Sequence, residues 1–378
     1  MSEEKTILRE SKQQRKEKIR TAVLGASGLV GQSFVLLLSD HPFFKPVFLS
    51  ASPENAGKTF GQVCLLHHPS LPAGPGFRLP EEIRNLEFHP PDPELLEKAG
   101  VQAVFSSLPA ALAQTVEKEL RARGFAVFSN SSAHRHDPEI PVLIPEVNPE
   151  HLRLAEIQKK KHGGFIVAGS NCCVAGAALA LKPLLAASRR LPSSIRINTY
   201  QSISGAGRRG LSAFDLAGNL IPYISGEEEK IQKEIPKIFG RLERAKIHPA
   251  RMKIKAACVR VPVASGHLLH LEVEWREKIS SARILRSLKT GSGLKRIPLP
   301  TAPSNPLILR TEDDRPQPAL DLSPGEPARA AGMAITLGRI KLDENSVSLF
   351  LLVNNLVRGA AGNCLLAAEL ALISGLIG

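Results

Sequence analysis

The sequence predicts an α/β protein: a Rossmann-type doubly wound parallel sheet, followed by a second domain of α+β type. Residues 20–129 alternate short apolar strands with helical segments, an order typical of a parallel sheet covered by helices on both faces. From about Ser194 onward, extended and partly alternating segments follow one another, which favours a mixed or antiparallel sheet. The chain of 378 residues is long enough for two such domains.

A glycine-rich turn connects the first strand to the first helix. The expected strand Arg20–Leu24 continues into the turn Gly25–Gly31 and then into the apolar helix Gln32–Leu38. Such glycines let the backbone approach a pyrophosphate, and the helix N-terminus supplies free N–H groups to it. A plain tight turn is the alternative for this glycine spacing, but the flanking strand and helix favour a dinucleotide site. The cofactor-binding residues predicted in the turn are Gly25, Ser27, Gly28, Leu29, Val30 and Gly31.

The end of the next strand bears on which dinucleotide is bound. The strand Pro46–Leu49 is followed by Ser50 and Ser52, where an NAD site usually places an acid for the ribose 2′-hydroxyl. The two serines, with Lys58 nearby, can accommodate a 2′-phosphate, whereas Glu54 argues the other way. We therefore predict NADP as the cofactor, bound in part by Ser50 and Ser52, with NAD as the alternative.

Further segments complete the predicted first domain. Val101–Ser106 and Phe125–Ser129 are expected strands joined by a helix, and residues 69–93 are expected to form a loop with a short strand around Leu86-Glu-Phe88. The polar residues 130–137 follow a strand end, where ligand contacts often lie in open α/β sheets.

The second domain is expected to combine extended segments with few helices. Helices are predicted at Gly210–Leu220 and after Gly226, and Pro298–Asp321 is predicted to be an irregular loop. The Ala- and Leu-rich helix Arg358–Ile377 should pack on a core, against the first domain. The predicted strands are Ile195–Ser204, Lys253–Val263, Leu268–Trp275 and Ser346–Val353.

Composition and charge narrow the class of protein. Hydrophobic residues make up 43% and charged residues 22% of the chain, which indicates a globular protein. The net charge of +13 suits nucleic acid, an anionic membrane surface or an anionic small substrate, but the 4% aromatic content disfavours stacking on single strands. We expect a solvated basic tail over residues 1–19 and no membrane-spanning segment. Five irregularly spaced cysteines indicate a reduced, cytoplasmic protein without a structural zinc site.

Two adjacent cysteines, Cys172 and Cys173, follow Asn171 and are flanked by small residues. They lie between the expected strand Phe165–Val167 and an expected helix over Ala177–Leu181. A thiol at the start of a helix feels the positive end of the helix dipole, which favours the thiolate and so a nucleophile. Taken alone, such a pair is more often buried as small hydrophobic side chains.

Two more motifs accompany the cysteines: Gln201-Ser-Ile-Ser-Gly-Ala-Gly207, and the segment from Arg260 to His267. A cysteine, a nicotinamide cofactor and a histidine base together suggest aldehyde chemistry through a thioester whose acyl group exchanges with phosphate. Alone, His267 would more often be a satisfied core or surface histidine, and Arg260 would more often form a surface ion pair.

Taken together, these motifs resemble the aspartate-β-semialdehyde dehydrogenase family, in particular its archaeal and fungal branch, over nearly the whole chain from Arg20. One departure is Cys173, where the family more often has Ser or Thr. The stretches that carry the resemblance are Gly25–Gly31, Ser132-Ala-His-Arg-His-Asp-Pro138, Ile144-Pro-Glu-Val-Asn148, Asn171-Cys172, Gln201–Gly207, Ile221–Lys230, Arg260–His267, Arg315-Pro-Gln-Pro318 and Val357–Gly362.

The resemblance implies a role for each matching residue. Cys172 would be the acyl-forming nucleophile, Gln201 would orient the acyl group, and His267 would be the acid and base. The substrate-binding residues implied are Arg260 for the carboxylate, Glu227 and Lys230 for the amino group and the phosphate, and Arg135 and Asn171 for the phosphate. The remaining cofactor-binding residues implied are Asn355, near the nicotinamide amide, and Ser204 and Gly205.

The implied reaction is the NADP-dependent reductive dephosphorylation of aspartyl phosphate to aspartate semialdehyde, on the route to lysine, threonine, methionine and isoleucine. The expected domains are a tail (1–19), a dinucleotide-binding domain (20–170, with 355–378 returning to it) and a catalytic and dimerisation domain (171–354). A homodimer or homotetramer is expected, with no nucleic-acid or membrane partner and no metal. Malonyl-CoA reductase is the nearest rival, N-acetyl-glutamyl-phosphate reductase is more distant, and a nucleic-acid-binding protein is favoured by net charge alone.

Overall fold

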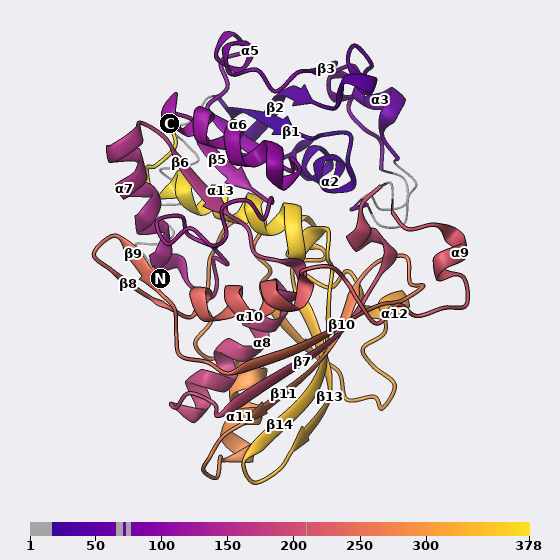
Figure 1. The fold of residues 1–378 in the computed structure, drawn as a ribbon, viewed down its shortest axis with the longest axis vertical. Coiled ribbons are helices and arrows are strands. Elements are labelled where there is room, and N and C mark those ends of the chain that lie inside the picture. Colours follow the sequence, from indigo (N-terminus) through magenta and orange to yellow (C-terminus); the bar gives the residue numbers. More distant parts are fainter. Residues whose placement is uncertain (1–16, 66–70, 73–76, 209) are drawn as a thin grey trace.

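The computed structural model describes residues 17–65, 71–72, 77–208 and 210–378. Most of the predicted basic tail, and parts of the loop predicted at 69–93, lie outside the described residues. The described chain forms two large sheets, one in the upper and one in the lower half of Figure 1, and a small hairpin of β8 (Arg241–Glu243) and β9 (Lys246–His248).

The first sheet has six strands, and every adjacent pair in it is parallel. Its order is doubly wound and reverses between β1 and β4, the position where ligands bind in open α/β sheets. This confirms the predicted Rossmann-type architecture. The strands, in spatial order, are β3 (Phe88–His89), β2 (Phe44–Ser50), β1 (Ile19–Leu24), β4 (Ala103–Ser106), β5 (Ala126–Ser129) and β6 (Phe165–Ala168).

Helices cover both faces of this sheet, and phenylalanine side chains in mutual contact fill the core beneath them. Phe34, Phe105, Phe128 and Phe165 form a chain of ring contacts with centroids 5.3–5.8 Å apart. The C-terminal helix packs into the same core, as its apolar composition predicts. The helices are α2 (Leu29–Leu38), α3 (Phe60–Val63), α4 (Glu81–Arg84), α5 (Pro93–Lys98), α6 (Ala110–Ala122), α7 (Arg153–His162) and α13 (Gly362–Ile373).

The second sheet is mixed, in agreement with the prediction. Burial alternates residue by residue along its central strands, so that one face is buried and the other is open. The helices α8 (Cys172–Ser188), α10 (Glu227–Ile238) and α11 (Ser281–Thr290) cover the buried face (Figure 1). The strands, in spatial order, are β10 (Ile254–Arg260), β7 (Ser194–Gln201), β11 (His267–Glu274), β14 (Ser346–Val353), β13 (Ile335–Leu342) and β12 (Leu307–Leu309).

Several predicted elements differ from the structure in their bounds: α2 begins at Leu29 and not at Gln32, and α8 extends beyond the predicted Ala177–Leu181 at both ends. The helix predicted at 210–220 shrinks to α9 (Ala213–Leu216), because Gly210 and Gly218 adopt positive φ values that end helical geometry. The loop predicted at 298–321 contains β12 and the short helix α12 (Pro318–Asp321). The last helix starts four residues later than predicted, after a π-helical turn over Val357–Ala361. Short 3₁₀ turns occur at Pro53–Asn55, Pro149–Leu152, Ile203–Ala206 and Ala328–Ala330.

None of the helices in the described ranges combines the length and the apolar character needed to cross a bilayer.

Candidate active site

Cys172 is the first residue of α8, and three residues separate it from the end of β6. Asn171 caps the helix: its Oδ1 accepts hydrogen bonds from the backbone N–H groups of Cys173 (3.0 Å) and Val174 (3.3 Å). An Asn in this position satisfies two of the free N–H groups at the helix start and fixes where the helix begins. The cap therefore holds the Cys172 thiol at the positive end of a 17-residue helix.

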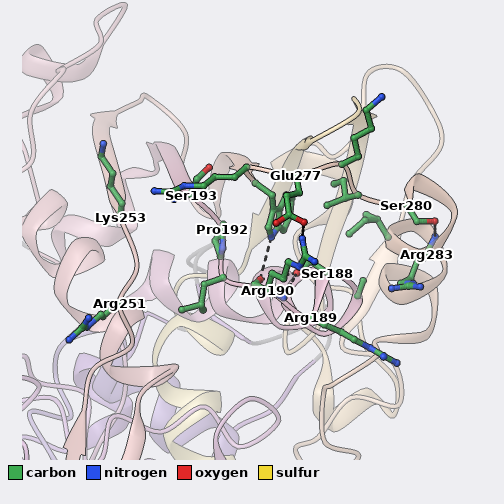
Figure 2. A pocket seen from close by; sticks show the side chains of 17 residues that line it. Ser188, Arg189, Arg190, Pro192, Ser193, Arg251, Lys253, Glu277, Ser280 and Arg283 are labelled. Carbon is green, nitrogen blue, oxygen red and sulfur yellow. Dashed lines mark hydrogen bonds and ion pairs between the residues drawn. The ribbon is translucent and has the colours of Figure 1, made fainter.

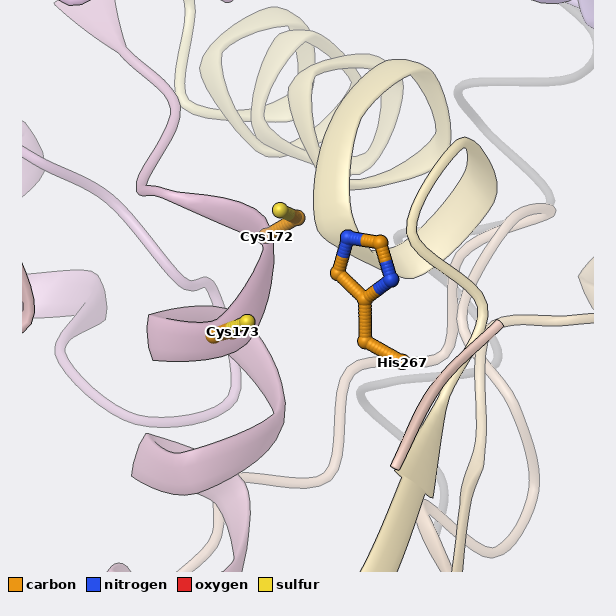
Figure 3. Close-up of side chains that lie close together, drawn as sticks. All are labelled: Cys172, Cys173 and His267. Atoms are coloured by element: carbon orange, nitrogen blue, oxygen red, sulfur yellow. The ribbon is translucent and has the colours of Figure 1, made fainter. Parts of the chain in front are cut away.

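Cys172 is half-buried, and its neighbours favour the thiolate. The Cys173 thiol, by hydrogen bonding to Cys172, and the nearby His267 together hold the pKa of Cys172 well below its usual value, although burial acts in the opposite direction. Burial raises the pKa of Cys173, so this fully buried neighbour stays a thiol. The two sulfurs and a ring nitrogen of His267 lie within 4.8 Å of one another (Figure 3).

The tautomer of His267 follows from one backbone hydrogen bond. The N–H of Ser202 donates to Nδ1 at 3.1 Å, and a backbone N–H can only donate, so Nδ1 carries the lone pair. The neutral ring must then carry its proton on Nε2, which points toward Cys172 in Figure 3. Nε2 is buried and has no hydrogen-bond partner within the described ranges. Its proton is therefore directed at the nucleophile and at any acyl group bound to it.

We expect selective alkylation of Cys172 by iodoacetamide near neutral pH. The thiolate is the reactive form and exists above the pKa, so a lowered pKa brings the alkylation rate to its plateau at a lower pH. Cys64 is also half-buried, but burial raises its pKa to about 11, so it should react only in strongly alkaline solution. Peptide mapping after timed alkylation between pH 5 and 10 measures both profiles; equal rates at the two cysteines at pH 7 would contradict the assignment.

The ends of four neighbouring strands bring distant residues together. In the parallel pair of β10 and β7, Arg260 lies directly opposite Gln201. On the other side of β7, β11 begins at His267, and that residue pairs with Val353 at the end of β14, two residues before Asn355. The strand register thus places Arg260, Gln201, His267 and Asn355 at one edge of the mixed sheet, beside the start of α8.

Helix α10 contributes a carboxylate that links several of the predicted residues. Glu227 Oε2 accepts hydrogen bonds from Asn171 Nδ2 (2.7 Å) and Gln201 Nε2 (3.4 Å), and Oε1 accepts one from Lys230 Nζ (2.7 Å). Burial alone would raise the pKa of Glu227, but these hydrogen bonds, above all that from Lys230, lower it below its ordinary value. Glu227 is therefore a carboxylate at neutral pH and orients Asn171, the residue that caps the nucleophile helix.

A second carboxylate on α10, Glu234, was not identified from the sequence. One oxygen pairs with Arg135 Nη1 at 3.1 Å, and the other accepts the backbone N–H of Asn171 at 2.6 Å. Glu234 is fully buried, so both contacts are shielded from water. The spacing of Glu227, Lys230 and Glu234 puts all three on one helix face, a pattern that could have pointed to Glu234. Arg135 is held by Glu234 and by the Asn130 carbonyl, and its predicted role in phosphate binding stays a prediction.

Arg260 and Gly205 show how closely the site is packed. Arg260 Nη1 donates to the Ser202 carbonyl at 2.7 Å, so the residue that fixes the His267 tautomer also orients the guanidinium. A Cβ added at Gly205 would lie 2.8 Å from Arg260 Nη1 and 3.0 Å from His267, so any other residue there would displace the Arg260 guanidinium. The amide of Asn355 binds the hydroxyl of Ser204 (2.9 Å) and the N–H of Gly266 (3.0 Å).

The glycine-rich turn has the close backbone approach that a dinucleotide loop requires. A Cβ at Gly31 would lie 2.2 Å from the Gly25 carbonyl oxygen, and Gly25 itself has φ +73°. Gly28 is the N-cap residue of α2 and has no side chain to cap the helix, so the first N–H groups of the helix are open to a phosphate. At the end of β2, the Ser50 hydroxyl is buried without a partner among the described residues.

A cavity of about 370 Å³ joins the turn to the cysteine. Of the predicted site residues, it is lined by Gly28, Leu29, Val30, Arg135, Asn171, Cys172, Ser204, Gly205, Glu227, Lys230 and Asn355. The predicted residues that do not line it are Gly25, Ser27, Gly31, Ser50, Ser52, Gln201, Arg260 and His267. The last three lie directly behind residues that form its wall: Gln201 behind Glu227, Arg260 behind Gly205, and His267 behind Gly205 and Cys172.

A larger cavity, of about 740 Å³, lies elsewhere on the molecule (Figure 2). It is formed by the end of α8, the start of α11 and the loop after β11, and basic side chains such as Arg251 and Lys253 line it. It contains none of the predicted site residues, and Glu277 pairs with Arg190 across it. The smaller cavity at Cys172 is therefore the candidate active site.

The fold and the site define an oxidoreductase with a nucleotide-binding parallel sheet. Comparison with known proteins is more specific: residues 20–155 match the model "Semialdehyde dehydrogenase, NAD binding domain", and residues 181–358 match "Semialdehyde dehydrogenase, dimerisation domain". The chain belongs to the semialdehyde dehydrogenase family.

Similar proteins include an aspartate-semialdehyde dehydrogenase of Archaeoglobus fulgidus, 40% identical over 92% of this chain and 96% of its own. A malonyl CoA reductase (NADP) of Metallosphaera sedula is 35% identical over 95% of this chain and 98% of its own. A crystal structure of aspartate semialdehyde dehydrogenase with NADP from Candida albicans superposes with a TM-score of 0.80 at 32% identity, covering 95% of this chain and 100% of the other.

Proposed function

We propose that the chain is an aspartate-semialdehyde dehydrogenase that reduces aspartyl phosphate to aspartate semialdehyde with NADPH. The observation that carries the proposal is the group of Cys172 at a capped helix start, the Nε2–H of His267 facing it, and Arg260 behind His267. The named archaeal and fungal relatives support the same activity. Its product would feed the synthesis of lysine, threonine, methionine and isoleucine, and we place the enzyme in the cytoplasm.

The residues of the site divide the reaction into steps. The Cys172 thiolate attacks the acyl carbon, the carbon–oxygen bond to phosphate breaks, and an acyl thioester remains on the sulfur. A nicotinamide cofactor, when bound, would supply the hydride that reduces the thioester carbon. His267 acts as the acid by sharing its Nε2 proton in a hydrogen bond to the oxygen as it becomes negative, and Nε2 keeps that proton as the carbonyl re-forms, the carbon–sulfur bond breaks, the aldehyde leaves and the Cys172 thiolate is regenerated. Gln201 and Asn171, both held by Glu227, keep the acyl group and the nucleophile in place.

The chain fits a dinucleotide on the features of its own loop. The open N–H groups at the start of α2 would hold the pyrophosphate, and the absence of a side chain at Gly31 lets the helix pack closely against the turn. The unpartnered hydroxyl of Ser50, with Ser52 and Lys58 nearby, would meet the adenosine ribose or its 2′-phosphate. Asn355 and Ser204, which bind each other beside the cysteine, would contact the nicotinamide amide. The NADP-bound Candida relative supports NADP over NAD.

Replacing Arg260 should weaken substrate binding and leave cofactor binding unchanged. In Arg260→Leu, the substrate carboxylate loses a charged partner in a buried site, which costs about 2–5 kcal/mol in kcat/KM, or roughly 30-fold or more. The kcat/KM of Arg260→Lys should lie between that of Arg260→Leu and that of the parent, because lysine keeps the positive charge but cannot bind the carboxylate with two parallel N–H groups. Steady-state kinetics with each substrate varied in turn provide the measurement. An unchanged KM for aspartate semialdehyde in Arg260→Leu would remove the carboxylate role.

A second candidate is malonyl-CoA reduction, favoured by the Metallosphaera relative at 35% identity. Both substrates would form a thioester at Cys172, and they differ in the amino group and in the leaving group. The deciding experiment is the oxidation of aspartate semialdehyde by NADP with and without phosphate, run beside the oxidation of malonate semialdehyde by NADP with and without coenzyme A. Phosphate-dependent turnover of aspartate semialdehyde supports the proposed function; coenzyme A-dependent turnover of malonate semialdehyde alone would replace it.

We further propose a homodimer formed through the open face of the mixed sheet. Arg196, Asn198 and Tyr200 on β7 point outward and are exposed, and the rings of His270 and Phe350 contact each other on the neighbouring strands with centroids 4.8 Å apart. The family description of this region as a dimerisation domain supports the same surface. A charge at Tyr200, which is 38% exposed, should therefore weaken association.

In Tyr200→Glu, two copies of the new charge would be buried near each other in the assembled protein. We expect the sedimentation coefficient of the variant to fall to that of a monomer at micromolar concentration. Leu112→Glu, on an exposed face of α6, is the control and should sediment like the parent. A Tyr200→Glu protein that sediments like the parent would exclude this face as the interface.

A further inference from the structure

Three ligand atoms of the kind that bind soft metals lie together beside the substrate cavity. They are Cys172 Sγ, Cys173 Sγ and a ring nitrogen of His267, all within 4.8 Å of one another. Figure 3 shows the imidazole facing the first turn of α8, from which both thiols extend. In tetrahedral zinc coordination with Zn–S distances of about 2.3 Å, the two sulfurs lie about 3.8 Å apart. Movements of about 1 Å in the ligand atoms, through rotation of their side chains, would therefore be enough to form the site.

We propose that Cys172, Cys173 and His267 form a reversible inhibitory site for a thiophilic divalent cation such as zinc or cadmium. Two thiolates and one imidazole are the ligand set that these ions prefer. The fourth coordination position would open onto the cavity that Cys172 lines, where water would fill it. The role as an inhibitor rests on the proposed function, since the ion would occupy the proposed nucleophile; the binding itself does not.

Proton transfer accompanies binding and balances without any other reactant. The cation forms bonds to both sulfurs and to Nε2, each remaining thiol proton is released to water, and the two thiolates neutralise the charge of the ion. The Nε2 proton also leaves, and the neutral ring takes up a proton at Nδ1. The hydrogen bond that Nδ1 accepts from the Ser202 backbone N–H is then lost, and the Ser202 hydroxyl, 3.2 Å from Nδ1, can accept the new N–H in its place. Metal binding therefore replaces the ring tautomer that the catalytic steps need.

An unpartnered nitrogen and a nearby carboxylate both favour cation binding at this site. The unpartnered Nε2 of His267 is buried and directed at the cysteines, so a ligand there removes an unsatisfied polar group. The Glu227 carboxylate adds negative charge close to both sulfurs, and Arg260 opposes it. Cys173 provides the third ligand, and a Ser or Thr in its place would leave a weaker set of two.

The test uses cobalt(II) as a spectroscopic substitute for zinc. The full-length protein, free of metal and kept reduced with a phosphine, should bind one equivalent of cobalt with thiolate charge-transfer bands and the strong visible bands of tetrahedral coordination. Zinc should displace these bands and inhibit turnover, and a chelator should restore activity. Cys173→Ser keeps a hydroxyl that can hydrogen-bond to Cys172 and removes the third ligand. The affinity of Cys173→Ser for cobalt should fall by more than roughly 10–100-fold, which is the usual cost of losing only a group that hydrogen-bonds to a metal ligand.

The control variant is Cys64→Ser, which removes the other half-buried thiol and should bind cobalt like the parent. The absence of thiolate bands in the parent, or equal affinity in the parent and Cys173→Ser, overturns the proposal. Circular dichroism identifies a misfolded Cys173→Ser protein, in which case Cys172→Ser takes its place with the same expected loss. If the bands form but the protein has no dehydrogenase activity, the proposed function fails and the metal site stands.

Discussion

Cys172→Ser should lower the rate of aspartate semialdehyde oxidation by about 10⁴- to 10⁶-fold, the range seen when an enzyme loses a covalent nucleophile. A serine hydroxyl at this position would remain protonated, since the helix dipole and one imidazole favour a thiolate far more than an alkoxide. The cap at Asn171 uses backbone N–H groups and does not involve the thiol, so the fold of the variant should be unchanged. Stopped-flow absorbance of NADPH measures the loss.

Two controls make this prediction specific to Cys172. Cys64→Ser should keep the parent rate, because Cys64 does not line the cavity that holds Cys172. Cys172→Ser should still bind NADP, measured by fluorescence titration, which separates lost chemistry from lost folding. Mass spectrometry of acid-quenched enzyme should show an acyl adduct on the parent and none on the variant. Turnover by Cys172→Ser within tenfold of the parent would end the thioester mechanism.

His267→Asn should reduce kcat by about 10²- to 10⁴-fold, the usual contribution of a positioned acid or base. An amide cannot exchange a proton with the substrate oxygen, so the reduction step loses its acid. The change also removes one of the groups that lower the pKa of Cys172, so the alkylation plateau of Cys172 should move to higher pH. The shift in alkylation separates a catalytic role from a purely structural one.

His248→Asn is the matched control, since this histidine is exposed on β9 and lies outside the cavity. It should leave both the rate and the alkylation profile as they are in the parent. A second variant, Ser202→Ala, keeps the backbone N–H that fixes the His267 tautomer and removes the hydroxyl beside Nδ1. A His267→Asn protein with full turnover and an unshifted profile would leave the imidazole without a role in the reaction.

Local patterns in the sequence were enough to predict the parts of the site that depend on neighbouring residues. The turn from Gly25 to Gly31 and the Asn171-Cys172 junction are each fixed by residues a few positions apart, and both have the expected geometry. Steric limits on glycines and the preference of Asn for helix caps act over one turn of chain, so a short window contains the information.

The arrangement of Arg260, Gln201 and His267 needed the structure. Their meeting point depends on the register of β10 and β11 on either side of β7, and pairing register follows from the packing of whole sheets. The resemblance to a known family named these residues but gave no contacts among them. Glu234 was missed for a related reason: a charged helix residue is usually solvated, and only tertiary packing buries this one against Arg135 and Asn171.

The short junction between β6 and α8 constrains how this enzyme family can change. The last strand of the parallel sheet ends at Ala168, and α8, which packs on the mixed sheet, begins at Cys172. Three residues therefore join the parallel-sheet half of the molecule to the mixed-sheet half, directly before the proposed nucleophile. Arg135 and Asn171 precede α8, whereas their partners Glu227 and Glu234 follow it. Recombination between related genes at this junction would pair one parent's Asn171 with another parent's Glu227 and Glu234, and mismatched partners would displace the thiol. The cofactor-binding and substrate-binding halves should therefore be inherited together, and chimaeras that keep 130–234 from one parent should be the active ones.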